Sequence, residues 1–173
     1  MAGEPARREA YDSFLLDKGT YSPQIWPFGL MPAEPQKPSL YERLGGIYSI
    51  SCVVDDLIDR VMTDARLNAN PAVNEAHHKV PPPGFKYLVT EMVGWASGGP
   101  QVYTGRPMRE SHEHLKITPK EWEAFMDDLQ QSLDRFNVPS AEQTELKAIV
   151  QSTYGDIVIG KDKAPETAST AGP

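Results

Sequence analysis

The sequence predicts an all-α domain, and three observations support this prediction. Apolar residues between positions 39 and 160 recur at three- and four-residue spacing, which is typical of helices with one buried face. Two capping boxes, Ser39–Glu42 and Thr118–Glu121, mark helix starts, and Pro119 fits the first position of the second of these helices. No stretch of useful length alternates between apolar and polar residues, so no strand is expected.

One folded domain is expected over residues 39–160, between two tails. The chain of 173 residues has room for one hydrophobic core. Residues 1–38 are predicted to form a proline-rich N-terminal extension, because prolines at positions 5, 23, 27, 32, 35 and 38 block long helices. Residues 161–173 are small, polar and charged, and are predicted to be disordered. The N-terminal arm is either a loosely ordered tail or a segment that packs on this domain or on a protein partner, because it carries Tyr21, Trp26, Phe28 and Leu30.

Composition excludes several classes of partner. The net charge of −7 argues against nucleic acid or an anionic membrane surface as the main partner. No apolar run approaches the roughly 20 residues that a membrane span needs, and the N-terminus has neither a signal-peptide core nor transit-peptide character. The single cysteine, Cys52, cannot form an intramolecular disulfide and fits the cytoplasm or another reducing soluble compartment.

The first half of the domain is predicted to contain three helices. A short helix over Leu40–Leu44 ends at a glycine pair, and a second helix covers Ile47–Thr63. A polar, proline-rich connection is expected from Asn68 to Gly84, and a third helix from Phe85 to Ser97 ends at Gly98-Gly99-Pro100. In the second helix, Cys52 is assigned to the core, and the solvent face is assigned to Asp55, Asp56, Asp59 and Arg60.

The second half is predicted to contain two further capped helices. The box at Thr118–Glu121 begins one helix, and its core stripe is expected to extend to Phe136. Val138-Pro139 ends that helix, and a box at Ser140–Gln143 begins the last one. The sequence contains no phosphate-binding glycine loop, no cysteine pair at zinc spacing and no nucleophile elbow.

The stretch from Gly98 to Thr118 contains two of the four histidines, behind a glycine-proline breaker. A short helix placed there can present one imidazole to a buried metal or cofactor. The alternative is an ordinary joint between helices with two surface histidines. His77-His78 form the other pair, and these are expected at the surface because no acidic or cysteine partner stands at ligand spacing.

Four segments carry a resemblance to a known family. Leu40–Gly46, Val53–Val61, Gly98–Met108 and Ser111-His112 resemble the truncated haemoglobins, specifically the first group of that family. The similarity covers about residues 39–160, and the spacing from Gly98 to Trp122 matches without a gap. The resemblance implies a two-over-two helical sandwich around haem b, in a core smaller than that of full-length globins.

On the proximal side the family pattern is intact. His112 falls where the family places the histidine that binds the haem iron, and its other ring nitrogen is expected to donate to a carbonyl. His114 lies about 200° around the helix, so both histidines cannot face the iron. Tyr103 falls where family members approach a haem propionate, and Arg106 is a candidate partner for a propionate from its charge. The positions that pack on the proximal side are matched by Met108, Ser111, Leu115, Ile117 and Trp122.

On the distal side the sequence departs from the family. Leu57-Ile58 stand where many members carry Phe-Tyr, and Phe85 and Val89 stand where polar residues are common. The phenylalanine that wedges against the haem is replaced near Asn70, and the following connection is longer. Bound dioxygen needs a hydrogen-bond donor worth about 1–3 kcal/mol, which this pocket does not offer. An apolar pocket therefore favours NO or CO.

Two functions remain open from the sequence. The first is a haem-binding truncated globin that binds a diatomic gas (NO, CO or O2), with NO dioxygenase-like or redox activity as its enzymatic form. The second is a degenerate globin that serves as a structural or interaction subunit, with weak or no haem binding. A second protein ligand to the iron is also open, and its candidates are Lys86, Tyr87, His77 and His78.

Overall fold

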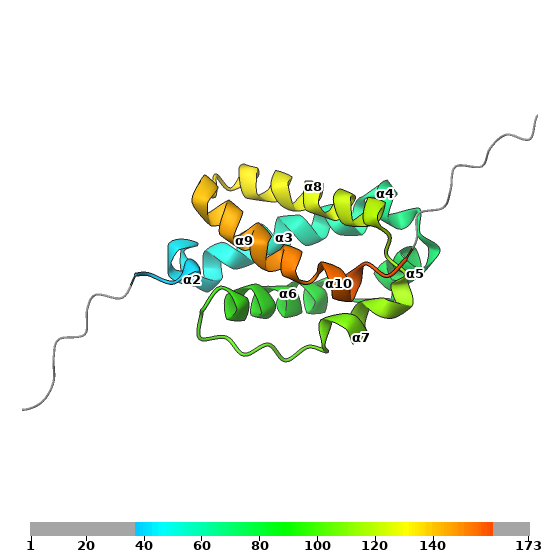
Figure 1. Cartoon of the computed structure of the whole chain (residues 1–173), viewed down its shortest axis with the longest axis horizontal. Helices are drawn as coiled ribbons and strands as arrows, with labels where there is room; N and C mark the ends of the chain where they lie inside the picture. The colour runs from blue at the N-terminus through cyan, green and yellow to red at the C-terminus, as the bar shows by residue number, and fades with distance from the viewer. Residues whose placement is uncertain (1–36, 161–173) are drawn as a thin grey trace, which may run out of the picture. The chain divides into compact units, whose positions relative to one another are not determined.

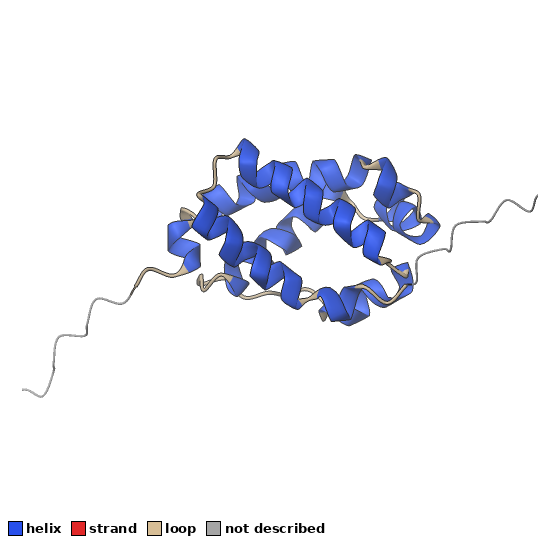
Figure 2. Ribbon diagram, turned by 45° about the horizontal axis from the view of Figure 1, so that its top comes forward, coloured by secondary structure: helices blue, strands red, loops and turns tan. Residues whose placement is uncertain are grey.

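The described part of the chain folds into helices, most of them joined by short loops. The computed structural model describes residues 37–160, and no strand occurs within that range (Figures 1 and 2). The predicted all-α class is therefore confirmed for this part of the chain, whereas the aromatic arm residues at positions 21–30 lie outside it. The elements are α2 (Leu40–Arg43), α3 (Gly46–Thr63), α4 (Ala65–Asn68), α5 (Pro71–Lys79), α6 (Pro82–Ala96), α7 (Met108–His112), the 3-10 helix η1 (Glu113–Leu115), α8 (Pro119–Arg135), α9 (Ser140–Ser152) and α10 (Tyr154–Ile157).

The long helix α3 is the centre of the packing. It contacts α6 on one side and α8 on the other, while α2 packs on both α3 and α9. The main core cluster lies between α3 and α8 and reaches α4, α5 and α9. It is formed by Leu40, Leu57, Val61, Leu67, Val73, Ala124, Leu129, Leu133 and Leu146. A second cluster, Ile50, Val54 and Ile58, lies on the α6 side of α3.

The start of α2 and the end of α6 are joined at a crowded glycine. Ser39 and Glu42 form the predicted capping box, in which the Ser39 N–H donates to Glu42 Oε2 at 2.8 Å. A Cβ on Gly99 would lie 2.4 Å from Tyr41 Cδ2 and 2.7 Å from the carbonyl oxygen of Gly94. The second residue of the Gly98-Gly99 pair is therefore a glycine because α2 and α6 meet there without room for a side chain.

The prediction of a polar connection over residues 68–84 is wrong, because most of these residues are helical. Asn70 caps α5 by accepting from the Ala72 N–H at 3.0 Å, and Pro71 takes the first helical position. Helix α6 begins at Pro82 rather than Phe85. Prolines are tolerated in a first helical turn, where the backbone N–H needs no intrahelical partner, so this proline run starts a helix.

Two assignments on α3 are also wrong. Asp56 is buried, at 8% exposure, and accepts hydrogen bonds from Ser132 Oγ and Arg60 Nε, each at 2.8 Å. Burial alone would raise the pKa of Asp56, but the hydrogen bonds from Arg60 and Ser132 and the charge of Arg135 give a net lowering. Cys52 is exposed rather than buried, because it shares a solvent-facing stripe of the helix with Tyr48.

The start of α9 differs from the prediction as well. No side-chain cap forms at Ser140, and Pro139 occupies the capping position. Gln143 donates its amide to the Val138 carbonyl oxygen at 2.9 Å instead of closing a box. Phe136, predicted to continue the core stripe of α8, follows the end of that helix and is 40% exposed. Among residues 37–160, no helix is long and apolar enough to cross a membrane.

Candidate functional site

The segment that carries His112, made of α7 and η1, packs on α10 and α5. After α6 the chain runs back along the helix as an extended loop (Figure 1). Two contacts fix this path: the Gly99 N–H donates to the Gly94 carbonyl oxygen at 2.8 Å, and Thr104 Oγ1 donates to Glu91 Oε2 at 2.6 Å. Because the loop moves toward the start of α6 as it proceeds, α7 follows at the level of the first turns of α6.

One hydrogen bond defines the tautomer of the His112 imidazole and leaves its second ring nitrogen available to a ligand. Its Nδ1–H donates to the carbonyl oxygen of Met108 at 2.8 Å, since a carbonyl can only accept. The predicted carbonyl partner is therefore present. Burial lowers the pKa of His112, and the nearby His114 lowers it further against the opposing effect of the Met108 bond. A neutral imidazole with Nε2 left to bind is the form that ligates metals.

The other residues predicted near this ligand are spread over the segment. His114 is exposed on η1, whereas His112 is half-buried. Tyr103 is half-buried and donates its hydroxyl to the Arg106 carbonyl oxygen at 3.0 Å, and burial raises its pKa, with a further contribution from Glu91. The Arg106 side chain is exposed. Ser111 donates to the carbonyl oxygen one turn back, at Pro107, so its hydroxyl serves the helix itself.

Leu115, Ile117 and Trp122 lie on the core side of the segment. Leu115 and Ile117 are half-buried and pack against the main core cluster. Trp122 is buried on α8 and meets the Tyr154 ring edge-on, with ring centroids 5.3 Å apart. Leu115 and Ile117 thus attach the end of the segment to the core, and the Trp122–Tyr154 contact joins α8 to α10.

The predicted distal residues divide into two groups. Ile58, Phe85 and Val89 share one apolar cluster between α3 and α6. Leu57, the neighbour of Ile58 in sequence, belongs instead to the main core cluster. Neighbouring residues on a helix point about 100° apart, and here the two pack into different clusters. The structure therefore brings three of the four distal candidates together and separates Leu57 from them.

Helices α6 and α7 leave apolar surface that the described protein does not bury. Within α6 the only buried residue is Gly94, and within α7 and η1 none is buried. An amphipathic helix in a globular protein normally buries a full apolar stripe. The apolar side chains of α6 and α7 that stay partly exposed include Phe85, Leu88, Val89, Met92 and Met108. A flat apolar group with one imidazole ligand, such as the haem implied by the resemblance, fits this set of residues.

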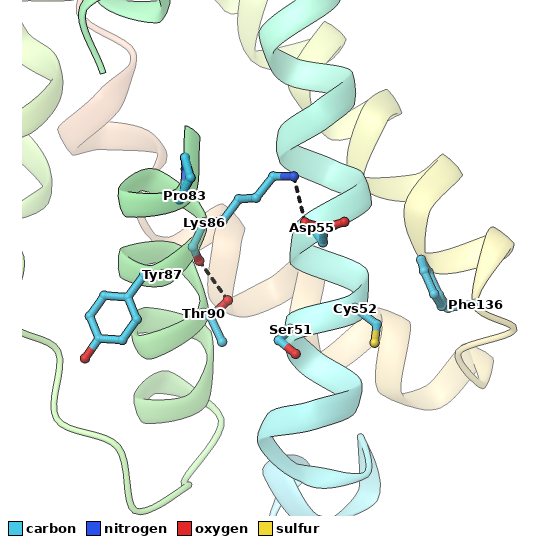
Figure 3. Close-up of a pocket in the computed structure, with 8 residues that line it drawn as sticks. All are labelled: Ser51, Cys52, Asp55, Pro83, Lys86, Tyr87, Thr90 and Phe136. Atoms are coloured by element: carbon cyan, nitrogen blue, oxygen red, sulfur yellow. Dashed lines mark hydrogen bonds and ion pairs between the residues drawn. The ribbon is translucent and has the colours of Figure 1, made fainter. Parts of the chain in front are cut away.

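The candidates for a second iron ligand on α6 are engaged elsewhere. Lys86 Nζ lies 2.6 Å from Asp55 Oδ1 and 2.6 Å from Asp59 Oδ1 on α3. The Tyr87 hydroxyl donates to Glu91 Oε1 at 2.6 Å. Both side chains border an open groove of about 560 Å³ between α3 and α6 (Figure 3). Apart from these two, no residue predicted for the haem site lines the groove, which is formed by Ser51, Cys52, Asp55, Pro83, Lys86, Tyr87, Thr90 and Phe136.

The histidine pair on α5 is also engaged. His77 Nδ1 donates to the Asn68 side-chain oxygen at 2.9 Å, and His78 Nδ1 donates to the Asn74 carbonyl oxygen at 2.8 Å. Burial lowers the pKa of His77, and His78 adds to this effect. Within the described residues, no group of three histidine, cysteine or acidic side chains is arranged to hold a metal ion.

One residue of the site was not identified as functional from the sequence. Asn70 donates its amide to the Leu115 carbonyl oxygen at 2.9 Å, so it joins the start of α5 to the end of the His112 segment. The Asn70-Pro71 pair is a recognisable helix start. The contact with Leu115, however, links positions far apart in the chain, which no local pattern reveals.

Comparison with known proteins gives one family and several relatives. The model of the family described as "Bacterial-like globin" matches residues 39–158. A group 1 truncated hemoglobin, GlbN, from Synechocystis sp. is 29% identical over 120 residues, which cover 64% of this chain and 88% of that protein. A group 1 truncated hemoglobin GlbN from Mycolicibacterium paratuberculosis is 28% identical over 129 residues, with 75% and 89% coverage.

Solved structures show the same fold. The truncated hemoglobin of Tetrahymena pyriformis in its Fe(III) form aligns with a TM-score of 0.59 at 21% identity, covering 70% of this chain and 98% of that one. The group II truncated hemoglobin of Bacillus anthracis aligns with a TM-score of 0.62 at 22% identity, with 76% and 98% coverage. These matches confirm the predicted resemblance to truncated haemoglobins and the two-over-two fold.

Proposed function

The chain belongs to the bacterial-like globin family, and we propose that it binds haem b with His112 as the protein ligand to the iron. The observation that carries the proposal is the half-buried imidazole, whose Nδ1–H is held by the Met108 carbonyl oxygen at 2.8 Å. Nε2 is then the nitrogen available to the iron. The lowered pKa keeps the ring neutral near pH 7, so no proton competes with the metal.

The incompletely buried apolar side chains of α6 and α7 support the same assignment. When bound, haem supplies an iron site at which a diatomic gas binds. Phe85, Val89 and Met108 provide apolar surface to a porphyrin, and burying that surface stabilises the holoprotein. Arg106, exposed beside Tyr103, is the cation that we assign to a propionate.

The distal cluster sets the proposed preference among gases. Ile58, Phe85 and Val89 carry no hydrogen-bond donor, and the Lys86 ammonium beside them is held by two aspartates. A polarised ligand such as O2 loses about 1–3 kcal/mol of binding free energy when the pocket has no hydrogen-bond donor. The less polarised CO and NO lose little binding free energy. We therefore propose that the protein binds NO or CO in preference to O2.

The deciding experiment is an absorption spectrum of the protein reconstituted with hemin. We expect a Soret band for the wild type and for His114→Ala, and loss of the axial-ligand signature in His112→Ala. His114 is a matched control because it lies two residues away and is exposed on η1. Titration of the reduced protein with CO and O2 then measures the gas preference.

Two results would contradict the proposal. If the wild type shows no Soret band, the chain does not hold haem, and the structural or interaction role is favoured. If His112→Ala keeps the wild-type spectrum, the iron is held by another residue.

A further inference from the structure

The segment that carries His112 has no core of its own. Neither α7 nor η1 contains a buried residue, and burial of apolar side chains is what normally fixes a short helix in place. The position of the imidazole therefore depends on contacts between this segment and its neighbours. Besides the packing of Leu115 on the main core cluster, these contacts include two polar ones, from α10 and from Asn70.

The beginning of the segment is held from α10. Arg109 Nη2 lies 3.0 Å from Asp156 Oδ1 and donates to the Gly155 carbonyl oxygen at 3.1 Å. Both partners of this ion pair are about half exposed, with side-chain exposures of 57% and 50%. Exposed ion pairs contribute about 0–1 kcal/mol, so this contact alone holds the segment weakly.

The end of the segment is held by Asn70. Its amide nitrogen lies 2.9 Å from the Leu115 carbonyl oxygen and 3.3 Å from Glu121 Oε2. The same Glu121 oxygen accepts the Thr118 N–H at 2.7 Å, in the capping box of α8. One half-buried side chain thus joins three elements: the cap of α5, the end of η1 and the first turn of α8.

We propose that Asn70 is a positioning residue for the iron ligand, a role that rests on the proposed function of His112. Leu115 lies one turn after His112, so a bond to its carbonyl limits the rotation and displacement of the imidazole. Near the position where the resemblance implies a phenylalanine packed against the haem, this chain has an amide that bonds to the segment carrying the ligand.

The variant Asn70→Asp separates the two roles of this side chain. Aspartate keeps the oxygen that accepts the Ala72 N–H, and it caps helices as well as asparagine does. It loses the donor to Leu115 and places a negative charge beside Glu121. The matched control is Asn68→Asp, because Asn68 also donates its amide to a backbone carbonyl, that of Met62 at 3.1 Å, without touching the segment.

Three measurements test the proposal: haem transfer to apomyoglobin, the iron–histidine stretching band of the reduced protein, and amide hydrogen exchange of the apoprotein. In Asn70→Asp we expect haem loss about fivefold faster, which is the effect of one ordinary hydrogen bond. We also expect a shifted or broadened iron–histidine band and faster exchange over residues 111–115. The amides of α5 are expected to exchange as in wild type, because the cap of that helix is kept.

The outcomes separate this proposal from the proposed function. If wild type and Asn68→Asp bind haem through His112 and Asn70→Asp matches them in all three measurements, the positioning role is wrong and the haem assignment stands. If the wild type binds no haem, both are wrong. Asn70→Ser serves as a second variant should Asn70→Asp fold poorly, because serine also caps α5 but is too short to bridge to Leu115.

Discussion

Replacing Asp128 with asparagine should stabilise the protein, and more so at high pH. Asp128 lies on α8 at 5% exposure, and its Oδ2 has no hydrogen-bond partner among residues 37–160. The nearest cation contact is Arg66 Nη2, 3.6 Å from Oδ1. Burial and the negative charge of Asp64 raise the pKa of Asp128 from 3.8 to about 6. At neutral pH the folded protein therefore holds an unfavourable buried charge.

The size and pH dependence follow from the linkage between protonation and folding. A raised carboxyl pKa means that the folded state binds the proton more tightly, so the contribution of Asp128 is favourable below pH 3.8 and is lost as the pH rises through about 6. The full difference between the unfolded and folded pKa values corresponds to about 3 kcal/mol of folding free energy. Asparagine is neutral throughout, so the gain of Asp128→Asn should increase by about 2–3 kcal/mol between pH 4 and pH 8.

Urea denaturation of the apoprotein at these two pH values measures this gain. Asp127→Asn is the control, because Asp127 is the adjacent residue but is about half exposed and paired with Arg66 at 2.9 Å. That variant should change the free energy of unfolding by less than about 1 kcal/mol at either pH. Equal effects of Asp128→Asn at both pH values, or a loss of stability at pH 8, would refute the reasoning.

Two further predictions concern the packing of the fold. Asp56→Ala should lower the free energy of unfolding by about 1–3 kcal/mol, because it removes the acceptor of the fully buried Ser132 hydroxyl, while the partly exposed Arg60 and Arg135 regain water. Urea denaturation checks this at pH 7, and the difference should shrink well below pH 4, where the lowered pKa of Asp56 allows protonation. Gly99→Ala should cost about 1–3 kcal/mol by overpacking against Tyr41. The control is Gly84→Ala, whose added Cβ meets nothing within 4 Å and which should be neutral or stabilising in the same urea denaturation assay. Equal effects of the two substitutions would contradict the crowding argument.

The local pattern of the chain determined the helices. The capping box at Ser39 and the start of α8 at Pro119 were predicted correctly, because caps and apolar spacing act within one or two turns. The same locality explains the error at residues 68–84. Prolines were interpreted as breakers, whereas Asn70 and Pro71 begin α5 and Pro82 begins α6.

Part of the candidate site could also be predicted from spacing. The distance of His112 from Met108 along the chain is one helical turn, so the carbonyl partner of its Nδ1 follows from helix geometry alone. The exposure of His114 follows from the same geometry. It was harder to predict which neighbouring helix each apolar residue of α3 faces. Leu57 and Ile58 are both apolar and both buried, and only their partners show that they belong to different clusters.

Contacts between distant segments were decided by the tertiary structure alone. In the sequence Asp56 resembles the other acidic residues of a solvent face. In the structure it is buried because Ser132 and Arg135 of α8 bind it. The bond from Asn70 to Leu115 likewise joins two segments that share no periodicity. A sequence determines which residues can form a helix, because those interactions are short-ranged. The pairing of polar groups across the core depends instead on the three-dimensional path of the chain. The same path determines where His112 lies.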